Sequence, residues 1–271
     1  MIRRPAVAGM FYPAGAHDLE RTVRGYIRGS GRSPESGVAG IVSPHAGYVY
    51  SGAVAGAAFA TAPDSVSCVV IVAPPHRYPV SGGSVFDGEG YSTPIGVAPV
   101  NRKVTGSLLD SGLCFQPAAH LNEHSAEVQV PFVQVRWPDA SIAVVLQGSD
   151  SPSFSRELAE AIDAAVSGER RPLLVASSDL SHYHSETVAR QKDSLMIRAF
   201  LSGDARRLRE AAAEGGEACG IGPIGTLMEY ARIRGCTRFE EIMWTTSAEA
   251  SGDSSSVVGY FAGCCAEEGV E

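Results

Sequence analysis

Three short apolar runs of this sequence are each followed by polar side chains that can bind a metal ion or move a proton. The runs and the residues behind them are Gly40–Ser43 before His45, Cys68–Ala73 before His76, and Leu173–Ala176 before Asp179 and His182. Runs of this length, rich in β-branched residues, are typical of buried strands. If the three strands are parallel, their carboxyl ends meet at one edge of a sheet, and the polar side chains converge there.

A histidine at the end of a single strand has an ordinary structural explanation. It can cap a loop or bond to a backbone carbonyl, and for any one of these imidazoles we favour that interpretation. Three converging strand ends reverse the preference, because imidazoles and a carboxylate at one edge form a donor set for a transition metal. The sequence therefore predicts a metal or catalytic site beyond these strands.

Cys219 adds a sulfur atom to the candidate donors. It precedes Pro223, and proline is well placed in the first turn of a helix. The positive end of a helix lowers the pKa of a nearby thiol, and a thiolate is a good ligand for iron, zinc or copper. The alternative is a small buried side chain, the commoner state of an isolated cysteine. Gly220 and Gly222 favour the ligand, because they let the backbone turn closely around a bound group.

The stretch from His120 to His124 has the order of an inverted zinc-peptidase motif, H-x-x-E-H. Such a motif needs both imidazoles on one helix. The sequence predicts a loop over residues 117–122 and a helix that starts near Glu123, which places His120 outside that helix. A zinc-dependent hydrolase is therefore a minor alternative. His124 stays a candidate site residue, or a cap of the helix start.

Composition excludes several other classes of protein. The 271 residues carry a net charge of −8 and no stripe of Lys or Arg, so we expect no nucleic-acid partner. The longest apolar run, residues 66–75, is shorter than the roughly 20 residues of a membrane helix, so we expect no membrane span. Pro5, Gly9 and Pro13 interrupt the first residues before a signal-peptide core develops, so we expect a cytoplasmic protein. Six cysteines without a C-x-x-C pair indicate reduced thiols.

The apolar runs alternate with helical patterns along the chain. No repeat or long linker divides it, so we predict one domain over residues 1–271. The alternation predicts an α/β fold with a central, mixed or mostly parallel sheet and helices on both faces. The expected strands are 38–43, 67–73, 141–147, 172–177, 239–245 and 257–262, and the expected helices are 18–28, 123–135, 155–166, 186–201, 205–213 and 223–234.

Several motifs resemble those of one known family in their order along the chain. They are Arg4–Pro13, Pro44–Tyr48, Tyr91–Gly96, Glu123–Ser125, Ser177–His182, Cys219–Ile224 and Ser251–Tyr260. In this order they resemble the Memo family, whose bacterial and archaeal members are called AmmeMemoRadiSam system protein B. The resemblance runs from the first residues to about Tyr260 and covers nearly the whole chain.

The resemblance implies a single α/β domain similar to the class III extradiol dioxygenases of the LigB type, which bind non-haem iron(II). It implies that a metal ion, iron(II) first and copper or zinc as alternatives, is held by His45, His76 and Cys219. The catalytic groups implied to lie beside the metal are His124, Asp179 and His182.

The implied activity is oxidative cleavage of a phenolic ring by iron(II) and O2. His124 or His182 would move the proton of a substrate hydroxyl, and Asp179 would orient an imidazole. Cys219 departs from the dioxygenases, which have a carboxylate there, and a thiolate can itself be oxidised. The competing hypothesis is a non-enzymatic module that binds a metal or recognises a protein or peptide. The family name also suggests AMMECR-type and radical SAM proteins as partners.

Overall fold

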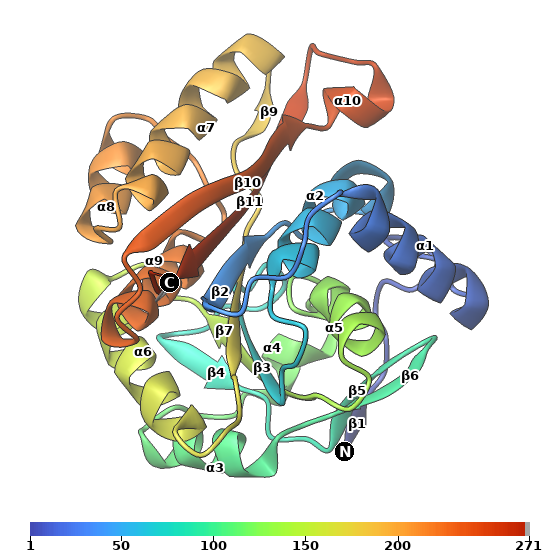
Figure 1. Cartoon of the computed structure of the whole chain (residues 1–271), viewed down its shortest axis with the longest axis vertical. Helices are drawn as coiled ribbons and strands as arrows, with labels where there is room; N and C mark the ends of the chain where they lie inside the picture. The colour runs from blue at the N-terminus through green and yellow to red at the C-terminus, as the bar shows by residue number, and fades with distance from the viewer. Residues whose placement is uncertain (269–271) are drawn as a thin grey trace.

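The computed structural model describes residues 1–268 and has a central sheet of eight strands. Seven of them lie in the order β10 (Arg238–Thr246), β11 (Val257–Ala266), β2 (Val38–Ser43), β8 (Leu173–Ser177), β3 (Cys68–Ala73), β7 (Ser141–Gln147) and β4 (Gly83–Val85), and β9 (His182–His184) pairs with β11 outside this path. The four central strands β2, β8, β3 and β7 are parallel, and the others pair antiparallel. The predicted α/β fold with a mixed sheet is confirmed (Figure 1).

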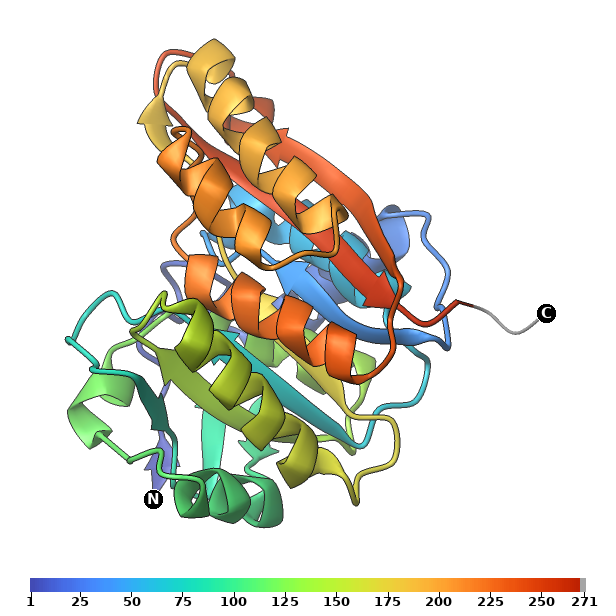
Figure 2. The ribbon, with the colours of Figure 1, turned by 90° about the vertical axis from the view of Figure 1, so that its left-hand side faces the viewer.

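Helices cover both faces of the central sheet (Figures 1 and 2). On one face lie α1 (Ala16–Gly29), α2 (Tyr48–Thr61) and α5 (Val130–Arg136), and on the other lie α6 (Pro152–Val166), α7 (Glu186–Leu201), α8 (Arg206–Ala213) and α9 (Ile221–Ile233). The remaining elements are α3 (Arg102–Asp110), α4 (Pro117–Leu121), α10 (Ala248–Ser251) and a small sheet of β1 (Ile2–Arg3), β5 (Gly90–Thr93) and β6 (Gly96–Pro99). Over residues 1–268, no helix has both the length and the apolar character needed to span a membrane.

Alternate residues of the inner strands supply the two halves of the core. In β3, Val69 and Ile71 pack with the cluster that includes α2 and α5, whereas Val70 and Val72 pack with the cluster that includes α6 and α9. This division follows from the two-residue period of a strand. All six residues of β3 are buried, because a parallel strand covered on both faces needs apolar side chains throughout.

The strands β2, β8 and β3 are neighbours, so their carboxyl ends lie side by side. Ser43 of β2 pairs with Ser177 of β8, and Val72 of β3 pairs with Ala176 of β8. The loops that leave these ends carry the histidines and the aspartate predicted from the sequence. The sheet thus places them at a single edge, where open α/β sheets bind ligands.

The predicted helix over residues 123–135 is wrong in its first half. Glu123 accepts the N–H groups of the two residues that follow it, which makes a turn, and a short 3-10 helix at Glu127–Gln129 leads into α5. The predicted loop at 117–122 contains α4, with Pro117 in its first turn, where a missing N–H costs no hydrogen bond.

Candidate metal centre

Two imidazoles and a thiol meet beyond the carboxyl ends of β2 and β3. His45 follows β2, His76 follows β3, and Cys219 precedes α9. One ligand atom from each residue lies within 4.8 Å of the other two. Sγ of Cys219 is 3.3 Å from Nε2 of His45, and the ring centroids of His45 and His76 are 5.1 Å apart. These three side chains form a group that could hold one metal ion.

His45 presents Nε2 to the group because its other ring nitrogen is engaged. Nδ1 lies 2.9 Å from Oγ of Ser177. The Ser177 hydroxyl donates to the carbonyl of Ser125, so it accepts from His45, and Nδ1 carries the ring proton. Burial, followed by the charges of His76 and His124, lowers the pKa of His45. The ring is therefore neutral, the form that binds a metal.

The thiol of Cys219 is held by the backbone of the loop after β8. The N–H of Asp179 donates to Sγ at 3.2 Å, and the N–H of Cys219 donates to the Asp179 carbonyl at 3.2 Å. Burial, followed by the charge of Asp179, raises the pKa of the thiol. The expectation of a lowered pKa is therefore wrong for the thiol without a metal, because burial disfavours the thiolate. Binding of a cation would replace the thiol proton.

Gly220 lets α9 begin directly against the end of β8. A Cβ at this position would lie 2.6 Å from the carbonyl oxygen of Ser177 and 2.6 Å from Cβ of Ser178. Gly222 faces the Gln147 side chain at the end of β7 in the same way, with 2.7 Å to its Nε2. The glycines thus serve close packing against strand ends.

Asp179 ties the loop of His45 to the loop of Cys219. Its Oδ1 accepts the backbone N–H of His45 at 2.7 Å, while its own backbone groups pair with Cys219. This bond to the backbone replaces the contact with an imidazole ring that the sequence suggested. Burial raises the pKa of Asp179, and the hydrogen bond from His45 opposes the rise.

His124 and Glu123 form a second group together with His76. Ligand atoms of these three residues also lie within 4.8 Å of one another. Nδ1 of His76 and Nδ1 of His124 are each 3.2 Å from Oε1 of Glu123. Burial acts to raise the pKa of Glu123, but hydrogen bonds from His124 and His76 outweigh it and hold this pKa well below its usual range. Phe11 packs edge-on against His124, with 4.9 Å between the ring centroids.

His182 and Tyr183 stand at the border of the site. Among the described residues, His182 belongs to neither donor group. It is nevertheless close enough for its charge to act on the pKa values of His45 and Asp179. Tyr183 has a φ of 63°, a left-handed conformation that is uncommon for a bulky residue, and strain of this kind concentrates at functional sites.

His120 lies apart from His124, so the inverted zinc motif does not assemble. Its ring nitrogens face the hydroxyl of Ser84 at 3.0 Å and that of Tyr91 at 3.2 Å. Burial, followed by the charge of Arg3, lowers the pKa of His120 to about 3. Since both ring nitrogens are occupied by hydroxyl groups, the geometry argues against the zinc-hydrolase alternative.

The sequence does not predict three residues that contact the candidate ligands or the loops that carry them. Glu123 contacts two rings, Ser177 anchors His45, and the Ser125 hydroxyl donates to the carbonyl of Pro74 at the end of β3. The sequence signal was present, because these residues adjoin candidate site residues in the motifs E-H-S and S-S-D. Sequence alone, however, does not show which ring nitrogen a hydroxyl or a carboxylate meets.

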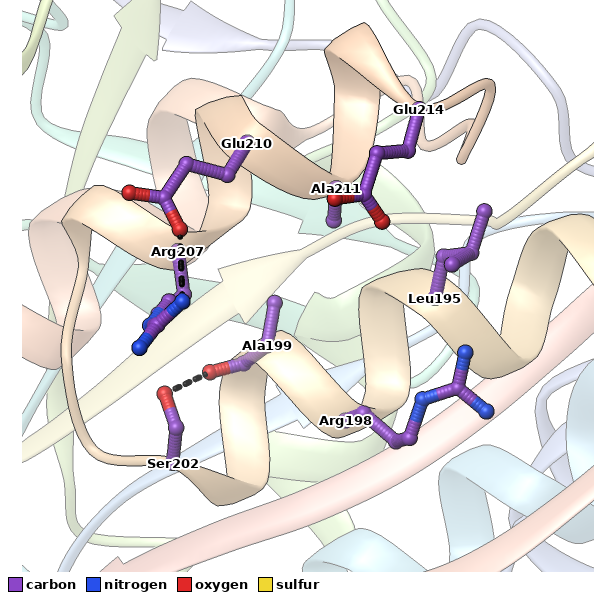
Figure 3. Close-up of a pocket in the computed structure, with 8 residues that line it drawn as sticks. All are labelled: Leu195, Arg198, Ala199, Ser202, Arg207, Glu210, Ala211 and Glu214. Atoms are coloured by element: carbon purple, nitrogen blue, oxygen red, sulfur yellow. Dashed lines mark hydrogen bonds and ion pairs between the residues drawn. The ribbon is translucent and has the colours of Figure 1, made fainter.

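A surface hollow between α7 and α8 holds none of these side chains (Figure 3). Arg198 of α7 and both Arg207 and Glu210 of α8 line it, and Arg207 pairs with Glu210 at 2.9 Å. It contains no imidazole or thiol. The candidate functional site is therefore the group of side chains at the strand ends.

Comparison with known proteins agrees with the motifs of the sequence. A family model described as Memo-like protein matches residues 3–264. A MEMO1 family protein of Thermotoga neapolitana is 34% identical over 275 residues, covering 96% of this chain and 98% of the relative. A MEMO1 family protein of Methanosarcina barkeri is 35% identical over 264 residues, with the same coverage. The chain belongs to the Memo-like protein family.

A solved structure has a weaker likeness to the chain. It is that of an uncharacterized protein, JW3007, from Escherichia coli K12, with a TM-score of 0.47 and 16% sequence identity, covering 74% of this chain and 87% of that one. A likeness at this level has no bearing on function.

Proposed function

We propose that this Memo-like protein is a metal-dependent oxidoreductase that holds one non-haem metal ion, iron(II) in first place, and acts on a phenolic small molecule. The observation that carries the proposal is the meeting of His45, His76 and Cys219 with ligand atoms within 4.8 Å. These residues come from three distant segments of the chain. They converge at the edge of the sheet where α/β proteins bind ligands.

The donor set fits a first-row transition metal. Imidazole and thiolate ligands suit iron, copper and zinc. The lowered pKa of His45 keeps Nε2 free to donate its lone pair, and Cys219 becomes an anionic donor when a cation replaces its proton. The side chain of His76 is 31% exposed, which leaves the group open to solvent on one side.

The residues beside the donors are suited to bind and move a proton. Bound iron(II) supplies redox chemistry with O2 and a positive charge that attracts a phenolate. The ring centroid of His124 lies 5.6 Å from that of His45 and 5.0 Å from that of His76, and an imidazole can take the proton of a phenolic hydroxyl and return it. His182 is the second group able to do so, and Asp179 positions His45 through its backbone.

Anaerobic reconstitution with iron(II), followed by a panel of catechols and phenols and then O2, tests this proposal. We expect the absorbance of ring-cleavage products with the wild-type protein. His124→Gln should retain iron but lose about 100-fold in rate, the usual contribution of a general base. Cys114→Ser, at an exposed thiol, serves as the control and should leave the rate unchanged. Iron-loaded protein that converts no member of the panel contradicts the oxidoreductase.

Cys219 favours a second candidate function, a protein that holds a metal ion without catalysis. A thiolate is a softer donor than the carboxylate of the dioxygenases, which suits copper(I), and it is itself open to oxidation. Tight copper(I) binding together with no turnover in the assay above would support this candidate.

A further inference from the structure

We propose that Glu123 is a positioning residue that fixes both the orientation and the tautomer of two rings, those of His76 and His124. By the same inference, the second donor group, His76, Glu123 and His124, is a hydrogen-bonded unit and not a second metal site. The assignment of a tautomer to each of the two rings rests on geometry alone. Its consequence for metal affinity rests on the function proposed above.

The carboxylate of Glu123 is buried, with 2% of the residue exposed, and is surrounded by backbone donors. Oε1 accepts the N–H groups of His124 at 2.9 Å and Ser125 at 3.1 Å. Oε2 accepts the N–H groups of His76 and of Arg77, the latter at 3.1 Å. Four N–H donors stabilise a negative charge, so the group needs no cation to be stable in the interior.

The two ring nitrogens nearest to this carboxylate must carry protons. Nδ1 of His76 and Nδ1 of His124 lie 3.2 Å from the same oxygen, Oε1. An ionised carboxylate only accepts, so a lone pair on either nitrogen would face a negative charge at close range. In residues 1–268, Nδ1 of His124 makes no hydrogen bond, and its 3.2 Å approach to Oε1 is a charge contact, so it is the charge of the carboxylate that favours a proton on this nitrogen. Both rings are therefore in the Nδ1–H form, with the lone pair on Nε2.

This assignment decides the chemistry of the two donor groups. The Nε2 lone pair of His76 is available to the group that contains His45 and Cys219, and the Nε2 lone pair of His124 is available to accept a substrate proton. A metal ion between Glu123 and the two Nδ1 atoms would have to remove both ring protons from their acceptor. The buried carboxylate of Glu123 thus directs the Nε2 lone pair of His76 to a metal ion and leaves that of His124 free as a base. Residues that contact the ligands of other metal sites orient them in the same way.

Long-range proton–nitrogen NMR of the 15N-labelled, metal-free protein at about pH 8, where imidazoles are neutral, tests the assignment directly. His76→Gln and His124→Gln identify the signals. We expect both rings as Nδ1–H in the wild type and a mixture of tautomers in Glu123→Gln, because an amide can both donate and accept. An Nε2–H form at either ring in the wild type overturns the proposal, and this result does not depend on the folding of Glu123→Gln. Unchanged tautomers in Glu123→Gln overturn it as well.

Titration with zinc(II) tests the consequence for the metal. We expect one ion per chain and an affinity reduced roughly 10- to 100-fold in Glu123→Gln. Glu217→Gln is the matched control, because Glu217 contacts His184 at 2.9 Å but is 41% exposed, so zinc affinity should be unchanged. Two ions per chain overturn the proposal. Wild-type protein that binds no zinc but has the expected tautomers contradicts the proposed function and supports the role of Glu123.

Discussion

His45 and His76 are each engaged through Nδ1 by an acceptor of the protein, and Nδ1 of His124 faces a carboxylate oxygen without a hydrogen bond. Ser177 accepts from the first ring, and Glu123 lies beside the other two. A ring engaged in this way loses a hydrogen bond when it rotates, so the free nitrogens are already directed before a cation arrives. Such preorganisation strengthens binding because less side-chain freedom is lost on association.

The lowered pKa of the buried His120 should make the stability of the protein depend on pH. Its folded-state pKa of about 3 lies below the ordinary value of 6.5, so the unfolded chain takes up a proton that the folded chain refuses. The resulting stability is present above about pH 6.5 and is lost as the pH falls towards 3, by up to about 1.4 kcal/mol per pH unit. In His120→Gln, urea unfolding between pH 7 and pH 4.5 should therefore show a smaller pH slope. Slopes that are equal in the two proteins would contradict this account of His120.

At this scale the sequence predicts the donor atoms better than their surroundings. His45, His76 and Cys219 are recognisable because metal-binding residue types follow strands or precede a helix. The role of Glu123 is not recognisable, because it depends on a turn that brings its side chain back to His76, 47 residues away. The pKa of Cys219 is likewise predicted wrongly, because burial depends on the whole fold.

At the scale of elements, the site depends on three parallel strands, of which β8 lies between β2 and β3 in the sheet but comes far after both in the chain. Their aligned ends position the loops after β2, β3 and β8, and α9 adds Cys219 by packing against the end of β8. The close approach at Gly220 thus brings both the start of α9 and the neighbouring Cys219 to the end of β8.

Gly220→Ala should disturb the group of His45, His76 and Cys219 more than the rest of the fold. The added Cβ would lie 2.6 Å from the Ser177 carbonyl, so the start of α9 must shift and carry Cys219 with it. We expect a loss of stability of about 1–3 kcal/mol and at least about a tenfold loss of zinc affinity, measured by urea unfolding and by metal titration. Gly25→Ala in α1 is the control, because its Cβ would meet nothing within 4 Å. Unchanged zinc affinity in Gly220→Ala would show that the close packing is not needed.

The elements with a continuous apolar run bounded by polar residues, or with a helical period, are the ones that the sequence predicts well. The bounds of β2, β7 and α7 agree with the prediction residue for residue. Helix α2 is missed, because eleven of its 14 residues are buried and it has no polar face to give a helical period. The small sheet of β1, β5 and β6 is missed because its strands are two to four residues long.

At the scale of the whole molecule, the N-terminal segment forms an ion pair and hydrogen bonds with residues 120–127, the segment that contains Glu123 and His124. Arg3 forms a fully buried ion pair with Glu127 at 2.6 Å and donates to the carbonyls of His120 and Glu123. Tyr12 also donates to Glu127. The first strand of the chain thereby supports the turn that contains Glu123.

Arg3→Met should leave the charge of Glu127 buried without its partner. We expect a loss of about 3–5 kcal/mol in the free energy of unfolding, measured with urea. Adding Glu127→Gln should restore part of this loss, since it removes the uncompensated charge. Arg4→Met, at the exposed neighbouring residue, should change stability by no more than about 0.5 kcal/mol. A single Arg3→Met variant as stable as Arg4→Met would contradict this role of the ion pair.

X-ray absorption spectroscopy tests most directly whether two imidazoles and the sulfur of Cys219 hold one metal ion. With one equivalent of zinc(II), the wild-type protein should show a sulfur neighbour at about 2.3 Å and nitrogen neighbours at about 2.0–2.1 Å. The sulfur signal should vanish in Cys219→Ser and persist in Cys114→Ser. A spectrum without sulfur in the wild type, or one that Cys219→Ser leaves unchanged, would contradict this coordination of the metal.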